Sequence, residues 1–327
     1  MRPIYKSQLK HNDLPVLKLQ AHGSAHCALQ AGQRLTAKKP LATKMTVKPK
    51  RTASNHFAVT QGFTLVELVV VITIVGILAG GVALFIGNPT QSFFDSERRA
   101  SLSDRADTAL RRMSRDIRNA LPNSVRITTN GADSLLEFTP VELAGRYRAS
   151  VGNAPATDNP LDFSIPTDNN FDVLGVPMTV TNNQSLVIYN LGIPGSDVYA
   201  GTSRRTLNAT TNGTILTFTG SSFPLASPSS RFQVVATPVT YACDMTNRIL
   251  WRYQGYAFQA AQPASIAALD GLSGVQRSQL ANNLANCQIT YTAGVLQRSG
   301  IVSVNISLTE DTARVTLMHQ INVANSP

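Results

Sequence analysis

Hydrophobic residues follow three different patterns along the chain. Residues 63–86 (FTLVELVVVITIVGILAGGVALFI) are almost continuously apolar, with Glu67 as the one charged residue. Residues 95–121 place apolar side chains every three or four positions among many charged ones, which is the period of an amphipathic helix. From residue 122 onward, short β-branched and aromatic runs alternate with turn residues. These patterns predict an α+β protein in which a long N-terminal helix packs on a β-rich C-terminal globular domain.

The first segment is long enough to cross a membrane. Its 24 residues would form a helix of about 36 Å, compared with roughly 30 Å for the hydrocarbon core of a bilayer. The apolar region of a secretory signal peptide has only about 7–15 residues, so the pattern favours a retained membrane helix. A basic flank precedes it, formed by Lys44, Lys48, Lys50 and Arg51. The positive-inside rule therefore predicts a cytoplasmic N-terminal segment and a body on the opposite side.

The second segment predicts a stem helix that packs under a sheet. Its arginine-rich face would be solvated or would meet neighbouring subunits, and a lipid-binding surface is the alternative. We expect a bend near Asn88-Pro89 and an end at Leu121, because the residue before Pro122 disfavours helix. The apolar stripe comprises Leu102, Ala106, Ala109, Leu110, Met113, Ile117, Ala120 and Leu121.

Several strands are predicted in the body. Asn130-Gly131 between two apolar runs predicts a β-hairpin. The expected strands are 125–128, 135–138, 185–191, 214–219, 231–236, 239–243, 248–254, 288–292, 301–308 and 313–323. The expected organisation is a leader over residues 1–62, an apolar helix over 63–86, a stem over 87–121 and a β-rich domain over 122–327.

Composition and charge refine this picture. The 327 residues are 43% hydrophobic and 15% charged, which fits an ordinary folded protein and excludes a disordered one. The formal net charge of +10 is confined to residues 1–62, which hold 11 Lys and Arg and a single acid, Asp13. The rest of the chain has equal numbers of acidic and basic residues. The charge therefore gives no support to a nucleic-acid partner.

Glu67 is the most informative residue of the apolar segment. A carboxylate inside a membrane helix costs about 2.5–3.5 kcal/mol on insertion scales, so it needs a partner unless it lies shallow enough to reach the interface. The run Gly62-Phe63-Thr64-Leu65-Val66-Glu67, followed by apolar residues and preceded by a basic flank, resembles the signature of type IV prepilins. Major pilins, minor pilins and type II secretion pseudopilins share that signature.

The resemblance implies a processing site and an assembly residue. A membrane prepilin peptidase would cut between Gly62 and Phe63 and methylate the new amino group of Phe63. Glu67 would neutralise the N-terminal amine of a neighbouring subunit, and positions 63 and 67 would share one helix face because they are four residues apart. A 62-residue leader is long for this family, and Met45 is an alternative start that gives an 18-residue leader.

Later segments resemble minor pilin-like subunits of mannose-sensitive haemagglutinin (MSHA) pilus biogenesis. The resemblance lies in residues 111–126, 232–235, 238–241 and 252–253. It implies a low-abundance subunit that initiates or caps the pilus, with partners in other minor and major pilins and an inner-membrane assembly platform. The expected location is the inner membrane of a Gram-negative bacterium, with a periplasmic body, and then the pilus at the cell surface. The alternatives are a minor pseudopilin of type II secretion and an unprocessed, single-pass anchored periplasmic binding or adhesion domain.

Other candidate chemistry is sparse. Cys27 lies in the expected leader, and an outward-facing body favours a disulfide between Cys243 and Cys287 over two buried thiols. His319 is the one histidine after residue 62 and lies on the apolar face of the last expected strand. We expect no catalytic residues, cofactor or metal, because the sequence lacks nucleophile, phosphate-loop and histidine-cluster motifs.

One loop has the spacing that opens a calcium site. Asp168, Asn170 and Asp172 match the first ligands of a calcium loop, but Val173 and Thr179 stand where such a loop needs Gly and Glu. The alternative to a calcium site is an ordinary solvated loop.

Overall fold

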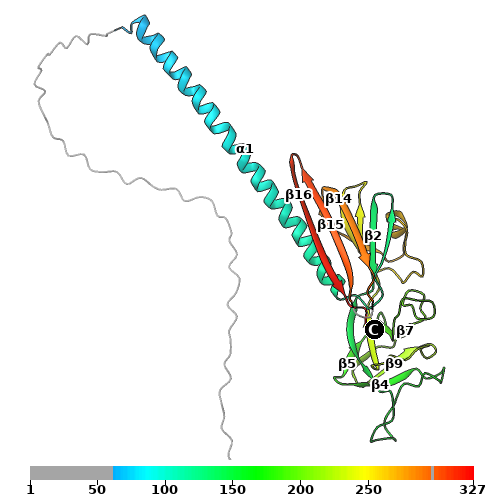
Figure 1. Cartoon of the computed structure of the whole chain (residues 1–327). Coiled ribbons are helices and arrows are strands. Elements are labelled where there is room, and N and C mark those ends of the chain that lie inside the picture. Colours follow the sequence, from blue (N-terminus) through cyan, green and yellow to red (C-terminus); the bar gives the residue numbers. More distant parts are fainter. Residues whose placement is uncertain (1–61, 296–297) are drawn as a thin grey trace, which may run out of the picture. The chain divides into compact units, whose positions relative to one another are not determined.

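The computed structural model describes residues 62–295 and 298–327 (Figure 1). The expected leader, apart from Gly62, and the alternative start at Met45 lie outside the described residues. The chain divides into one unit that ends at Phe63 and a second that runs from Thr64 to Pro327. The second unit contains a long helix and a β-rich body, so the α+β prediction is confirmed.

Helix α1 (Leu65–Arg118) combines the apolar segment and the stem in 54 residues. It continues through Asn88-Pro89, where the sequence predicts a bend. A proline in a helix interior removes one backbone hydrogen bond, and the backbone is helical on both sides of Pro89. The helix also ends three residues before the predicted Leu121. Ala120 instead bridges Pro140, and the Leu121 amide donates to the Thr139 carbonyl over 2.7 Å.

The main body consists of two antiparallel sheets that share one core with α1. The first sheet has the order β1-β2-β11-β12-β13 and the second has the order β14-β15-β16. Their bounds are β1 (Arg126–Asn130), β2 (Asp133–Phe138), β11 (Val239–Asp244), β12 (Ile249–Gln254), β13 (Gln276–Asn282), β14 (Leu284–Thr292), β15 (Gly300–Glu310) and β16 (Ala313–Val323). A short helix, α2 (Ile266–Asp270), belongs to a cluster with β2, β11 and β12 residues that is separate from the α1 core.

Burial confirms the predicted amphipathic pattern of the stem. The six stripe residues Leu102, Ala106, Ala109, Leu110, Met113 and Ile117 are each at most 2% exposed, and they pack with apolar residues of both sheets. The predicted alternation in the last two strands is also confirmed in β15, where Val302, Val304, Ile306 and Leu308 are buried. His319 is half-buried in β16.

The Asn130-Gly131 hairpin is confirmed. Strands β1 and β2 pair antiparallel up to Asn130 and Asp133. Gly131 has a φ of 60°, a left-handed conformation that glycine adopts without a steric penalty. The turn at Gly131 therefore sets the register in which β1 and β2 pair.

A closed barrel is formed by the chain between two neighbouring strands of the main sheet. Strands β2 and β11 are neighbours in that sheet, with Phe138 paired to Val239, although about 100 residues separate them. The intervening chain forms a barrel of order β10-β3-β4-β9-β7-β6, with a two-stranded β5-β8 sheet beside it. The strands are β3 (Val141–Tyr147), β4 (Asn170–Leu174), β5 (Met178–Val180), β6 (Ser185–Val187), β7 (Arg204–Leu207), β8 (Thr210–Gly213), β9 (Ile215–Thr219) and β10 (Arg231–Val235).

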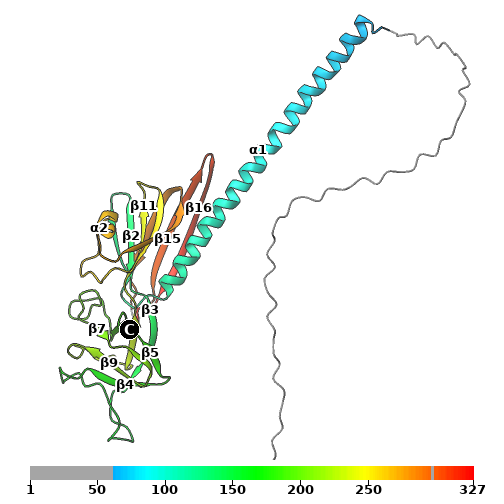
Figure 2. The same ribbon diagram turned by 180° about the vertical axis from the view of Figure 1, so that it is seen from behind.

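The barrel has its own aromatic core and docks at the end of α1. Its buried rings include Tyr147, Phe171, Phe218, Phe223 and Phe232. The segment just after α1 holds the barrel through hydrogen bonds from the Asn123 side chain to the Asn190 carbonyl (3.0 Å) and from the Tyr199 hydroxyl to the Ser124 carbonyl (2.8 Å). Figures 1 and 2 both show the barrel beyond the C-terminal end of α1.

A buried ion pair lies at the junction of sheet and barrel. The Arg126 guanidinium donates from Nε to Glu137 Oε2 over 2.6 Å, and the Tyr256 hydroxyl donates to the other carboxylate oxygen over 3.0 Å. Arg126 also donates to the carbonyls of residues 259 and 260 and lies 3.6 Å from the centre of the Tyr199 ring. Glu137 is fully buried. Burial raises the pKa of its carboxyl group, while Arg126 and Tyr256 oppose that rise.

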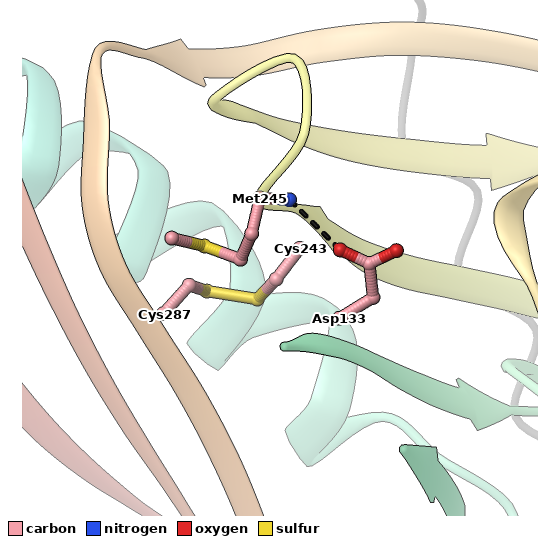
Figure 3. Close-up of a disulfide and its surroundings, with 4 residues drawn as sticks. All are labelled: Asp133, Cys243, Met245 and Cys287. Carbon is pink, nitrogen blue, oxygen red and sulfur yellow. Dashed lines mark hydrogen bonds between the residues drawn. A yellow bond between two sulfur atoms is a disulfide. The ribbon is translucent and has the colours of Figure 1, made fainter. Parts of the chain in front are cut away.

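A disulfide joins the two sheets of the main body (Figure 3). Cys243 in β11 and Cys287 in β14 have Cα atoms 5.9 Å apart, and both are buried in the core that contains α1. Beside it, the Asp133 carboxylate accepts a hydrogen bond from the Met245 amide over 2.9 Å (Figure 3). The disulfide therefore links strands of different sheets, and its two cysteines are 44 residues apart in sequence.

Candidate processing and assembly site

The expected scissile bond lies in an open, non-helical segment. Gly62 and Phe63 precede the first helix, and the Phe63 side chain is 79% exposed. A Cβ atom added at Gly62 would meet no atom within 4 Å. The structure therefore leaves this peptide bond accessible, and a small side chain at position 62 would not clash with the described chain.

Thr64 determines where the helix begins. It has extended backbone angles, and its hydroxyl accepts a hydrogen bond from the Glu67 amide over 3.2 Å, so it is the N-cap of α1. The helix therefore begins at Leu65, and Phe63 lies before its N-cap. The sequence Thr64-Leu65-Val66-Glu67 has the spacing of a capping box, a pattern that could have predicted this boundary.

Glu67 is exposed in the first turn of α1. It is the one acidic residue of that turn, where the helix dipole favours a negative charge. Within the described ranges no ion pair involves its carboxylate. Among the described residues, nothing therefore occupies the position of an ion-pair partner for this side chain.

The helix after Glu67 is exposed and strongly apolar. Leu65–Ala83 has a mean hydropathy of 2.6, and none of it is buried against the other described residues. In the part of the chain that the structure describes, it is the one helix with the length and composition to cross a membrane. An apolar surface of this length is stable in a bilayer or against other apolar helices, and is unfavourable in water.

The calcium spacing does not produce a converged ligand set. The Asp172 carboxylate accepts from Arg148 over 2.9 Å, and that of Asp168 accepts from the Asp162 amide over 2.6 Å. The Asn170 side chain accepts from the Asn159 side chain over 2.5 Å. Among residues 62–295 and 298–327, no group of three or more His, Cys, Asp or Glu side chains could hold a metal ion.

A comparison with protein families identifies the N-terminal pattern. Residues 59–83 match the family model described as the prokaryotic N-terminal methylation motif. The match contains Gly62, Phe63 and Glu67, and it supports a type IV pilin-like or pseudopilin protein that prepilin peptidase processes. No curated protein and no solved structure matches the chain.

Proposed function

We propose that the chain is a minor pilin-like structural subunit, most similar to MshO, that acts in the biogenesis of an MSHA-type type IV pilus. Its role is in the initiation or tip complex of the filament, and it has no enzymatic activity. One observation carries the proposal. The exposed apolar helix, with Glu67 in its first turn, follows Gly62-Phe63 directly within a methylation motif.

The proposed sequence of events assigns each residue a role. Leu65–Ala83 inserts into the inner membrane, with the leader in the cytoplasm and the body in the periplasm. Prepilin peptidase cuts after Gly62 and methylates Phe63. Glu67 then pairs with the N-terminal amine of a neighbouring pilin while the assembly platform moves the subunits into the filament. A charge pair between otherwise smooth apolar helices fixes their register.

Processing gives the first test. In cells with prepilin peptidase, the intact mass and N-terminal sequence should show a chain that begins at methylated Phe63. In cells without the peptidase, that species should be absent. Gly62→Val should remain uncleaved, and because the space around position 62 is open, the loss would reflect peptidase recognition and not misfolding. The same full-length chain in both strains would favour an unprocessed anchored domain and contradict the proposal.

Glu67 gives the second test. Glu67→Gln keeps the size of the side chain but removes its charge, so the chain should be processed normally and should lose most of its association with partner pilins. Thr64→Ser is the matched control, because it keeps the hydroxyl that caps the helix. The assay is co-purification from the membrane together with a count of pili per cell. Unchanged piliation and association in the Gln variant would refute the assembly role.

A minor pseudopilin of a type II secretion system is the second candidate, because the methylation motif is common to both classes. Deletion of the chain distinguishes them. Loss of pili with normal protein secretion supports the pilus subunit, and loss of secretion with normal piliation supports the pseudopilin.

A further inference from the structure

Strand β14 has one edge that no described strand covers. It stands at the end of the sheet order β14-β15-β16 and pairs antiparallel with β15 alone. Every second residue of such an edge strand turns its N–H and C=O groups to the open side. Among the described residues, no main-chain hydrogen bond outside the sheet ladders involves residues 286–292. The open side of β14 therefore presents a row of unpaired main-chain donors and acceptors.

The other sheet edges are covered or blunted. Residues 259–262 contact β1, where the Gln262 side chain donates to the Arg126 carbonyl over 3.4 Å. Helix α1 contacts β16 (Figure 1), and β16 also carries the exposed Arg314. Strand β13 has the exposed Arg277 and a bulge in its pairing with β12, while β5 and β8 have only three and four residues. Each of these features discourages an edge from pairing with another chain.

Strand β14 lacks these protective features over most of its length. Residues 286–292 (NCQITYT) include no charged residue and no proline. The bulge in the pairing of β14 with β15 lies before Asn286, so the rest of the strand is regular. Helix α1 lies at the opposite side of this sheet, beside β16 (Figure 1). A regular, uncharged edge of this length is suited to pair with a further strand.

A groove with a volume of about 500 Å³ lies beside this edge, between β14 and the β1–β2 turn. Its lining is uncharged and comprises Thr129, Gly131, Ala132, Ser134, Met245, Asn286, Cys287, Gln288, Ile289 and Thr290. Figure 3 shows Met245 and Cys287 in this region, and the neighbouring Asp133 carboxylate accepts from the Met245 amide over 2.9 Å. Gly131 and Ala132 on the turn have little or no side chain. The groove therefore has room for the side chains of an added strand, and its lining offers them no charged partner.

The direction of β14 excludes a symmetric pairing of two copies through this edge. At one end of β16, Arg98 of α1 pairs with Asp311 of the β15–β16 turn over 3.5 Å. Past the other end, the Asn123 side chain, just beyond α1, donates to the Asn325 carbonyl over 3.3 Å. Strand β16 therefore runs in the direction of α1, and so does β14, because both strands are antiparallel to β15. Two antiparallel β14 edges would point the two α1 helices in opposite directions, which insertion in one membrane does not allow.

We propose that the open edge of β14 binds an extended, uncharged segment of another pilin subunit, which adds a strand to this sheet beside the β1–β2 turn. In this mode of recognition, main-chain hydrogen bonds supply affinity and alternate side chains supply selectivity. The unpaired main chain of residues 286–292 identifies an extended segment as the occupant, and the uncharged groove selects against acidic or basic segments. The inference rests on the proposed function, which supplies the neighbouring subunits and their common orientation.

Photo-cross-linking identifies the occupant. In cells that produce prepilin peptidase and the pilus proteins, p-benzoylphenylalanine replaces Gln288 of the full chain in one strain and Gln320 in another. Both glutamines are exposed on edge strands of the same sheet, β14 and β16. We expect at least about fivefold more cross-link to another pilin from position 288, mapped by mass spectrometry to an extended segment without charged residues. Equal cross-linking at the two positions, or a product that maps to a helix or to a second copy of the chain, would overturn the proposal.

Amide hydrogen exchange tests main-chain pairing in the unsubstituted protein. The processed chain is compared alone and in the complex that co-purifies with partner pilins. Alternate amides of residues 286–292 should exchange at least about tenfold more slowly in the complex, because an added strand accepts hydrogen bonds from them. Exchange in β16 should not change. A complex in which β14 exchanges as fast as in the isolated chain would refute the added strand, since contact through side chains alone gives no such protection.

A charge placed on the edge tests its contribution to assembly. Gln288→Lys should lower co-purification with partner pilins by at least about fivefold, because a lysine blocks edge pairing. Gln320→Lys makes the same change on β16 and should have no effect, so equal effects of the two variants would contradict the proposal. Intact mass in the same samples separates the two hypotheses. An unprocessed wild-type chain refutes the proposed function and this inference with it, whereas a processed chain that co-purifies with pilins but shows no cross-link or protection at β14 refutes only the added strand.

Discussion

Arg126→Leu is expected to destabilise the protein by about 3–5 kcal/mol, which is the usual cost of breaking a buried ion pair by removing one partner. Glu137 is fully buried, and Arg126 is its sole ion-pair partner within the described ranges. The variant would therefore leave an unpaired carboxylate at the junction of sheet and barrel. It would also lose the hydrogen bonds to the carbonyls of residues 259 and 260. Urea unfolding of the full chain in detergent micelles measures the loss.

The loss should depend on pH in a defined direction. Burial raises the pKa of the Glu137 carboxyl and Arg126 opposes the rise, so removal of Arg126 raises the folded-state pKa further. The folded variant then binds a proton more tightly than the unfolded chain, and its stability falls as pH rises through the folded-state pKa. The deficit relative to wild type should therefore shrink between pH 7 and pH 5.

An exposed ion pair provides the control for this variant. Arg105→Leu removes a pair with Glu310, in which both side chains are about 40% exposed. It should cost at most about 1 kcal/mol. A similar loss in the two arginine variants, or an Arg126 deficit that does not change with pH, would show that the buried charge is not the cause.

Removal of the disulfide is the second large expected loss. Cys243→Ala with Cys287→Ala should lower the free energy of unfolding by about 4 kcal/mol, because the bond restricts the unfolded chain across a 44-residue separation. It also removes two buried sulfur atoms from the core shared by α1 and both sheets. Urea unfolding under non-reducing conditions measures the change.

A reductant supplies the matched control. The wild type in dithiothreitol should lose a similar amount of stability, and the double variant should be unaffected by the reductant. If the free energy of unfolding of the double variant were within about 1 kcal/mol of that of the oxidised wild type, the expected loss of about 4 kcal/mol would be contradicted.

Elements with a strong period and local signals could be predicted from the sequence. The apolar stripe from Leu102 to Ile117 identified the packed face of the stem, and strict alternation identified β15 and β16. The Asn130-Gly131 turn predicted the first hairpin because its chemistry is local. These features depend on residues that are close in sequence, so the order of hydrophobic and polar residues is enough to predict them.

The barrel could not be predicted in the same way. Strands β3, β4 and β7 were missed, since their stability comes from closure with strands far away in sequence, such as β10 with β3. In β3 the burial alternates between half-buried and exposed positions before Tyr147, with no continuous apolar run. The pairing of β2 with β11 across the insertion also has no local signal.

Some residues of the candidate site could be proposed from the sequence, and the role of one residue was missed. Gly62, Phe63 and Glu67 could be proposed from the sequence because the prepilin signature has fixed spacing, and they lie within residues 59–83, which match the methylation motif. The role of Thr64 as the helix cap was missed, although Thr64 and Glu67 have capping-box spacing. The boundary was hard to see in the sequence, because apolar residues lie on both sides of Thr64.

The insertion of the barrel between paired strands has an evolutionary consequence. Because Phe138 and Val239 are direct neighbours in the main sheet, the chain leaves and re-enters that sheet at one place. The two cores contain no common residue. Selection can therefore diversify or exchange the barrel as a module while the main sheet and α1 stay constant. A lineage can in this way acquire new surface chemistry in the barrel without a change in the main sheet or in α1.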